Sequence, residues 1–256
     1  MATTTPVGRT RADLVVELVL RDVRVRYRRS VLGVLWAQAA PLVYVAVLTL
    51  VFTRVVPLDI DDYPAFVLVG LLPWLWFQAA LTTATVAVVQ APDLVAQPAF
   101  PRSALPPAAV ASTLAHHLLA LPVAVVVAAI ATGHVGIELL ALVPLIAIEF
   151  AVCLGPAYVL AALHVRLRDT AQIVAILLLP LFYATPVFYD ADALDAVPVL
   201  RLNPLVAIID GHRRVLLEGR WPEPWALLAV GAAAVVLLLP CRSFYRARMG
   251  RFLEQM

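Results

Sequence analysis

Six apolar stretches constrain the fold of this chain more than any other feature. They occupy residues 34–56, 64–89, 108–132, 137–163, 170–189 and 224–240. A helix of about 20 apolar residues crosses the hydrocarbon core of a bilayer. Hydrophobic residues make up 63% of the 256 residues and charged residues 14%, which lies well outside the range of soluble globular domains. The sequence therefore predicts an all-α integral membrane protein with six transmembrane helices.

The arginines predict the orientation, because all 19 basic side chains are arginine. If both termini lie in the cytoplasm, fourteen arginines fall on the cytoplasmic side and five outside. Cytoplasmic loops of membrane proteins carry this kind of excess. The first thirty residues are charged throughout and lack the uninterrupted apolar core of a signal peptide, so we expect them to remain on the chain.

Residues 11–28 combine charged and apolar side chains at helical spacing on opposite faces. Charge recurs at Asp13, Glu17, Arg21 and Arg24. A helix this charged does not cross a bilayer, and we expect it to lie in the membrane surface with its apolar side down. A solvated amphipathic helix packed on a partner is the alternative interpretation.

A connection of more than thirty residues separates the fifth and sixth apolar stretches. Asn203 is a good N-cap, Pro204 suits the first helical turn and Gly219 suits the C-terminal end, so the pattern predicts a helix over residues 204–218. This helix is too short to cross the membrane. It is interpreted either as a re-entrant or interfacial element on the outer side, or as a surface cap on the bundle.

Three ionisable side chains stand out within the predicted spans: His116, His117 and Glu149. Adjacent histidines on a helix point about 100° apart and rarely share a metal, and the two cysteines, Cys153 and Cys241, fit neither a disulfide framework nor a metal site. We therefore predict no catalytic residue and no metal ligand. An intramembrane carboxyl faces the bundle interior or water. A pairing of Glu149 with His117, a direct role in function and a role as interior polar groups all stay open.

Aromatic side chains gather in the first, second and fifth apolar stretches. Trp74, Trp76 and Tyr189 suit the headgroup depth at which Trp and Tyr are enriched, whereas Tyr44 and Tyr183 lie farther inside. Aromatic faces at that depth stack on pyranose rings, while amides hydrogen-bond to sugar hydroxyls. These residues are interpreted as the lining of a path for a sugar chain: Trp36, Gln38, Tyr44, Gln78, Phe182 and Tyr183.

Two cytoplasmic segments are candidate interaction surfaces. Residues 90–107 combine several prolines with a short apolar centre and one arginine, which suits docking into a groove on a soluble partner. In residues 164–170 the basic side chains are more simply interpreted as anchors of a helix end. The chain has no lysine, and a P-loop needs one, so we expect no P-loop ATP site.

Several short motifs occur in a familiar order between residues 20 and 220. They are Tyr27-Arg28-Arg29-Ser30 with Leu32-Gly33, Leu35-Trp36 and Pro41-Leu42, then Phe100-Pro101-Arg102 with Leu105-Pro106, Arg168-Asp169, Pro186 with Tyr189, and Asn203-Pro204 with Arg213 or Arg214. This ordered set resembles ABC-2 type permeases that export polysaccharides such as O-antigen, capsular polysaccharide and teichoic acid.

The resemblance implies a homodimeric transmembrane domain that works with two copies of a separate ABC ATPase. ATP and Mg would bind to that ATPase, with no cofactor in this chain. It implies a cytoplasmic N-terminus with an interface helix (1–30), a six-helix domain (31–240) with re-entrant helices between spans five and six, and a basic cytoplasmic tail (241–256). The chain would be a transport subunit, not an enzyme, of a bacterial cytoplasmic membrane. A lipid-linked glycan and membrane lipids would be its partners, with no nucleic acid.

The resemblance also implies roles for particular residues. In the interface helix and its contact with lipid headgroups, these are Arg21, Arg24, Arg26, Tyr27, Arg28 and Arg29. In the coupling loop that contacts the ATPase, they are Asp93, Leu94, Phe100, Pro101 and Arg102. The glycan would pass between two protomers along the aromatic residues named above.

Two other interpretations stay open. A drug or lipid exporter permease of the same superfamily shares the six-span plan but usually lacks the Tyr-Arg-Arg-Ser to Leu-Gly motif. A membrane-embedded glycosyl or acyl transferase would need acids and histidines clustered at one interface, and the sequence shows no such cluster.

Overall fold

The computed structural model describes residues 11–27, 36–55, 58, 60–192 and 197–253. Within these ranges the chain is almost entirely helical and contains no β-strand, so the all-α prediction is confirmed. The helices are α1 (Arg11–Tyr27), α2 (Trp36–Leu50), the π-helix η2 (Val51–Val55), α3 (Tyr63–Val86), α4 (Pro92–Val95), η3 (Arg102–Ala104), α5 (Leu105–Thr132), η4 (Ile137–Ala141), α6 (Leu142–Arg166), α7 (Thr170–Tyr183), η6 (Pro198–Leu202), α8 (Pro204–Leu216) and α9 (Pro224–Leu253).

The helices agree with an integral membrane protein that crosses the bilayer several times. Four segments of the described chain are long and apolar enough to span: Tyr63–Val86, Arg102–Thr132, Ile137–Arg166 and Pro224–Gly250. Two further apolar helical segments, Pro41–Val55 and Thr170–Tyr183, are shorter. All six predicted stretches are therefore helical, and four of them have spanning length by themselves.

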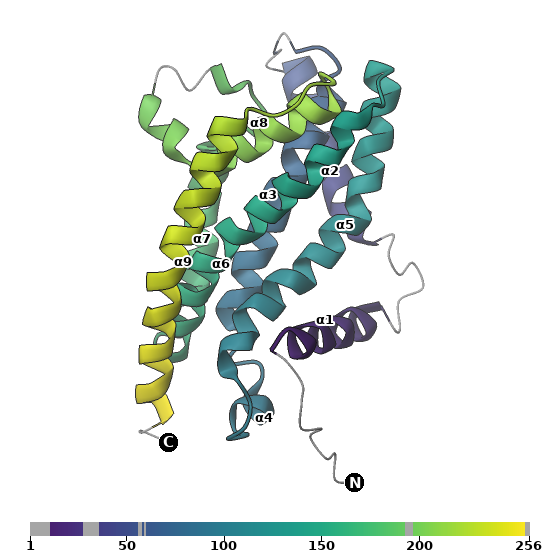
Figure 1. The fold of residues 1–256 in the computed structure, drawn as a ribbon. Coiled ribbons are helices and arrows are strands. Elements are labelled where there is room, and N and C mark those ends of the chain that lie inside the picture. Colours follow the sequence, from purple (N-terminus) through teal and green to yellow (C-terminus); the bar gives the residue numbers. More distant parts are fainter. Residues whose placement is uncertain (1–10, 28–35, 56–57, 59, 193–196, 254–256) are drawn as a thin grey trace.

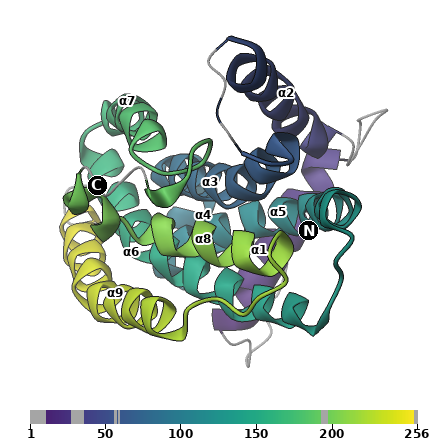
Figure 2. The ribbon, with the colours of Figure 1, turned by 90° about the horizontal axis from the view of Figure 1, so that it is seen from above.

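Helix α3 is the central helix of the bundle, with the other long helices arranged around it (Figure 2). In its apolar window 78% of the residues are buried, against 11% in the window of α9. Its side chains pack on α2, α5, α6, α7 and α8. The apolar residues of α3 thus form protein core, whereas most of those on α9 face outward.

The two ends of the bundle carry different short elements (Figure 1). At one end α1 lies across the long helices, next to α5 and η3. At the opposite end α8 crosses over α3 and α6. The arginine distribution predicts that the α1 end is cytoplasmic and the α8 end external.

The helix predicted over residues 204–218 is α8, and its N-terminal signal is confirmed. The side-chain oxygen of Asn203 accepts a hydrogen bond from the Leu205 N–H at 3.0 Å, and Pro204 occupies the first turn. Shortly after α8 ends, Gly219 adopts a φ of 62°, a left-handed conformation that suits glycine. Local capping chemistry therefore determines both ends of this helix.

Two predicted span boundaries are wrong. The fifth helix ends at Tyr183 instead of continuing to residue 189, because Pro186 provides no N–H and disfavours helical geometry in the residue before it. The sixth does not end at residue 240: α9 continues to Leu253 with Pro240 inside it. Much of the expected tail (241–256) is thus a continuation of the last helix.

Trp74 and Trp76, predicted to lie at headgroup depth, are buried inside the protein. Both indoles are 2% exposed. Trp74 packs on Phe182 with ring centroids 5.4 Å apart, and Trp76 stacks on His117 at 5.0 Å. Both tryptophans lie on the central helix, where neighbouring helices cover them at every depth.

Candidate functional site

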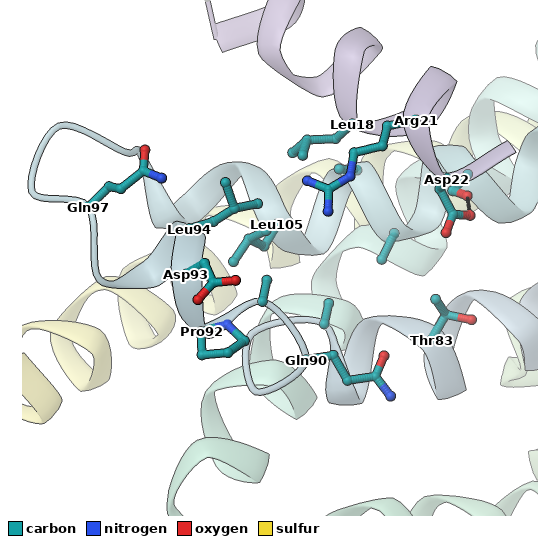
Figure 3. Close-up of a pocket in the computed structure, with 15 residues that line it drawn as sticks. Leu18, Arg21, Asp22, Thr83, Gln90, Pro92, Asp93, Leu94, Gln97 and Leu105 are labelled. Carbon is teal, nitrogen blue, oxygen red and sulfur yellow. Dashed lines mark hydrogen bonds between the residues drawn. The ribbon is translucent and has the colours of Figure 1, made fainter. Parts of the chain in front are cut away.

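A pocket of about 520 Å³ lies at the α1 end of the bundle, between α1, the segment around α4 and the start of α5 (Figure 3). Arg21 reaches from α1 toward this segment, which contributes Gln90, Asp93 and Gln97. Leu94 and Leu105 add an apolar wall. Cation, carboxylate and amides thus border one depression, next to the loop predicted to couple to an ATPase.

Helix α1 is attached to the bundle by both polar and apolar contacts. The Ser112 hydroxyl on α5 donates a hydrogen bond to the Asp22 carboxylate on α1. Leu14 and Leu18 pack against a buried cluster that includes Val95 and Phe100. Helix α1 thus contacts both α5 and the segment around α4.

The coupling loop is held to the bundle by its own predicted residues. Phe100 is 9% exposed and packs with Val95. The Arg102 Nε donates to the Val95 carbonyl at 2.9 Å, and the Arg102 carbonyl accepts from the Tyr245 hydroxyl at 2.9 Å. Pro101 precedes η3.

Exposure differs among the five coupling residues. Asp93 on α4 is exposed and Phe100 is buried, while Leu94, Pro101 and Arg102 are partly buried. Phe100 and Arg102 thus make contacts within the loop, and Asp93 is the one of these five residues whose side chain is exposed.

The arginines predicted for lipid headgroups lie partly within the described structure. Arg21 and Arg24 are exposed on α1. Helix α1 contains Arg26 and Tyr27, whose side chains are outside the described part, and Arg28 and Arg29 lie outside the described residues altogether.

A cavity of about 220 Å³ inside the membrane region brings four of the predicted path residues together. Tyr44 comes from α2, Gln78 from α3, and Phe182 and Tyr183 from α7. Trp74 closes the wall between them. The other two predicted residues, Trp36 and Gln38, belong to α2, and their side chains are outside the described part.

A second cavity of about 470 Å³ adjoins the first, since Tyr44 and Gln78 border both. It lies between α2, α3 and α5 and adds three threonines to the lining, together with His116 and His117. Aromatic faces, hydroxyls and an amide are therefore continuous over two cavities. This combination suits a ligand with both apolar faces and hydroxyl groups.

The intramembrane polar residues do not form one site. Glu149 on α6 is 0% exposed, and neither carboxylate oxygen has a hydrogen-bond partner among the described residues. His117 stacks on Trp76, and the His116 Nδ1 lies 2.8 Å from the Ser112 carbonyl. Within the described residues no hydrogen bond or ion pair joins Glu149 to His117, and no group of acids, histidines and cysteines is arranged to hold a metal.

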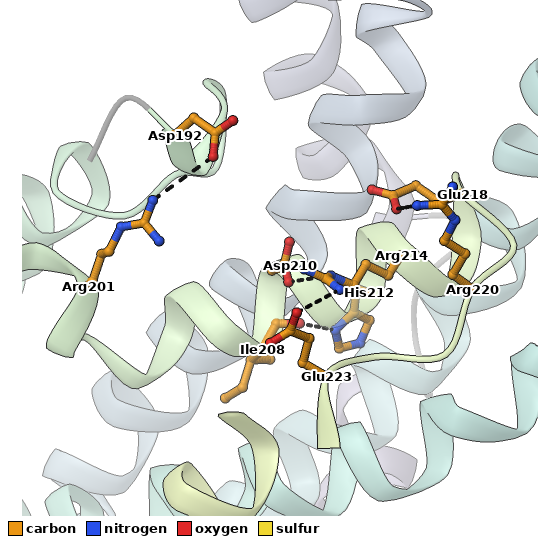
Figure 4. A network of polar contacts seen from close by, with 9 residues as sticks. All are labelled: Asp192, Arg201, Ile208, Asp210, His212, Arg214, Glu218, Arg220 and Glu223. Carbon is orange, nitrogen blue, oxygen red and sulfur yellow. Dashed lines mark hydrogen bonds and ion pairs between the residues drawn. The ribbon is translucent and has the colours of Figure 1, made fainter. Parts of the chain in front are cut away.

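The outer end carries a polar network around α8 (Figure 4). Arg214 is paired with Asp210 at 2.7 Å and with Glu223 at 3.2 Å. Beside this surface network, Arg213 is buried, and burial lowers its pKa to about 10, so it stays charged at neutral pH. Burial also lowers the pKa of His212 to about 4, so that imidazole is neutral there.

Comparison with known proteins identifies the family. The family model for ABC-2 type transporters matches residues 13–217, from α1 to the end of α8. The chain belongs to the ABC-2 type transporter family. It is 35% identical over 249 residues to the O-antigen export system permease protein RfbA of Myxococcus xanthus, covering 94% of each chain. It is 30% identical to a protein of the same name from Klebsiella pneumoniae, with 81% of each chain covered.

The α1 pocket, both membrane cavities and α8 all lie in the part of the chain that the ABC-2 family model matches. Sequence reasoning singled out neither Tyr63 nor the buried state of Arg213. The position of Arg213 among apolar residues of a short helix is a signal that could have predicted its burial.

Proposed function

We propose that this ABC-2 family member is the permease subunit of an ATP-driven exporter that moves a lipid-linked cell-surface polysaccharide across the cytoplasmic membrane. The observation that carries the proposal is the 35% identity, over 94% of both chains, with a protein named as an O-antigen export permease. The cavities support it, because their aromatic and hydroxyl lining matches the surface of a sugar chain.

ATP hydrolysis is assigned to a separate ABC ATPase, present in two copies. Asp93 and Leu94 on α4 would contact it, and Arg21 beside them would meet its surface or an anionic headgroup. The contact of α1 with both α5 and the α4 segment supports this assignment. Closure of the ATPase pair would then move α4 and α1 together and bias a two-state bundle.

The transport path is assigned to the space between two copies of the chain. Tyr44 is 44% exposed and Tyr183 is 61% exposed, so the cavity that they border is open on one side. A second copy facing that side would enclose a path with aromatic walls. The outer segment around α8 would be re-entrant, entering the membrane from outside without crossing it.

Purification in mild detergent from the native host tests the proposal. We expect an ABC ATPase to remain bound in a one-to-one ratio with the tagged chain, as identified by mass spectrometry. Deleting the chain should also trap lipid-linked glycan on the cytoplasmic side. A preparation without ATPase in several detergents would contradict the exporter, whereas an ATPase without glycan accumulation would favour a drug or lipid exporter.

Replacing Tyr183 by alanine tests the path. The change removes an aromatic face from the cavity wall, and we expect export to slow by about three- to tenfold with ATPase binding unchanged. Export is measured as the rate of appearance of glycan at the cell surface. Trp225→Ala is the matched control, because Trp225 is an aromatic residue 81% exposed on α9 and borders neither cavity. Normal flux in Tyr183→Ala would remove that tyrosine from the path.

A further inference from the structure

The chain reverses direction after α7, and the reversed segment is buried instead of forming an outer loop. In residues 184–190, Val187 is 0% exposed and Phe188 is 9% exposed. The Thr185 hydroxyl donates to the Leu181 carbonyl and accepts from the Asn203 amide at 2.8 Å. The segment is therefore attached at its start to both α7 and the N-terminus of α8.

Arg213 holds the centre of this segment through main-chain carbonyls. Its Nη2 donates to the Val187 carbonyl at 2.8 Å and its Nη1 to the Tyr189 carbonyl at 3.4 Å. The guanidinium carbon lies 3.6 Å from the centroid of the Phe66 ring on α3, a cation–π arrangement. A Cβ at Gly70 would come within 2.8 Å of both Nη2 and the Val187 oxygen, so the central helix leaves just enough room for this contact.

Tyr63 binds the main-chain carbonyl of Phe188, which lies between the carbonyls of Val187 and Tyr189. Its hydroxyl, at the start of α3, donates to the Phe188 carbonyl at 2.8 Å. Three consecutive carbonyls, from Val187 to Tyr189, are thus bound by side chains of α8 and α3. Because all three carbonyls are bound, the main chain of residues 187–189 is fixed, and so is the direction of their side chains.

That orientation places Phe188 among the aromatic residues at the outer end of the path. Its ring lies 5.3 Å from Phe52 on η2, 5.5 Å from Phe182 and 5.8 Å from Tyr183. Phe182 and Tyr183 are the outermost α7 residues of the 220 Å³ cavity. Phe188 therefore joins η2 and α7 beside the last α7 residues of the cavity.

We propose that Arg213 is a positioning residue that keeps the outer end of the transport path closed, by holding Phe188 between η2 and α7. This inference rests on the proposed function and adds a gate residue to it. Release of the two carbonyls leaves no buried anion, but it leaves the buried guanidinium without these acceptors, and that cost favours the closed arrangement. Release of Val187 and Tyr189 would withdraw Phe188 and open the cavity to the outside.

The test measures access to the cavity from outside. Gln78 is changed to cysteine after Cys153→Ala and Cys241→Ala, and intact cells are treated with a membrane-impermeant methanethiosulfonate. We expect slow labelling in this parent. Adding Arg213→Gln should accelerate it about tenfold or more, since two hydrogen bonds from a charged donor are lost. Tyr63→Phe, which removes one hydroxyl, should accelerate it by less.

Controls separate gating from a general loss of structure. Arg214→Gln changes the neighbouring arginine, which pairs with Asp210 and Glu223 at the surface, and should leave the rate unchanged. A cysteine in place of Val199, exposed on η6, should be labelled equally in every variant. If Arg213→Gln does not accumulate in the membrane, Tyr63→Phe carries the test.

The outcomes are independent of the cargo. Equal labelling rates in the parent, Arg213→Gln and Tyr63→Phe, at equal membrane abundance, would overturn the gate. Faster labelling without any bound ATPase in the purification would keep the gate and reject the exporter. Faster labelling at Val199→Cys as well would show unfolding of the outer end, and would also count against the gate.

Discussion

Replacing Phe100 and Arg102 together by aspartate is expected to abolish export and to release more than about nine tenths of the bound ATPase. Phe100 lies in the buried cluster with Val95 and Tyr245, so the change places a carboxylate among apolar side chains. Arg102 supplies the hydrogen bond that closes the loop on Val95. Without both, α4 loses its support, and its exposed residues lose the geometry that a partner recognises.

ATPase recovery in a pull-down and glycan at the cell surface are the two measurements. Membrane insertion should be normal, because the long helices keep their apolar residues. Arg246→Asp is the matched control: it makes the same charge reversal on an exposed side chain at the same end of the molecule. Phe100→Leu should retain ATPase binding. Full export by the double variant would show that this loop does not couple to the ATPase.

Replacing Glu149 by methionine is expected to raise the free energy of unfolding by about 1–3 kcal/mol and leave export unchanged. The carboxyl is 0% exposed, and both oxygens lack a partner within the described chain. Methionine fills a similar volume without a polar group, so the cost of the buried carboxyl disappears.

Thermal unfolding of the purified complex in detergent measures the change, with Glu149→Gln as the polar control. The glutamine variant should remain near the parent in stability, because an amide in the same place is also without a partner. A stable Glu149→Met protein that fails to export would contradict the prediction. It would then assign Glu149 to the transport cycle.

Local signals predicted much of this structure. The start of α8 depends on the hydrogen bond between the Asn203 side chain and the Leu205 N–H and on the ring of Pro204. Three consecutive residues are therefore enough to predict it. Hydropathy located all six apolar helices for a similar reason. The grouping of Tyr44, Gln78, Phe182 and Tyr183 followed from their similar depth, and the structure places them around one cavity.

Contacts between residues far apart in the sequence could not be predicted from the sequence. Residues 184–189 contain no charged side chain and follow a strongly apolar helix, so hydropathy predicts a longer span than the structure shows. The Arg213 contact joins residues 24 and 26 positions apart, and Tyr63 meets Phe188 across 125 positions. The hydrophobic periodicity of one segment contains no information about contacts with another segment.

The burial of α3 divides the apolar residues of this chain into two kinds, although their composition is the same. On α3, Leu71 and Val67 are 0% exposed and touch protein on all sides, so a change of one methylene there alters packing. On α9, Val236 and Leu237 are more than half exposed, so a change of size meets only lipid. The central helix therefore tolerates few apolar exchanges, whereas the outward face of α9 accepts most of them and rejects charge. Among functional variants, apolar substitutions should consequently accumulate on the outward face of the bundle and be rare on α3.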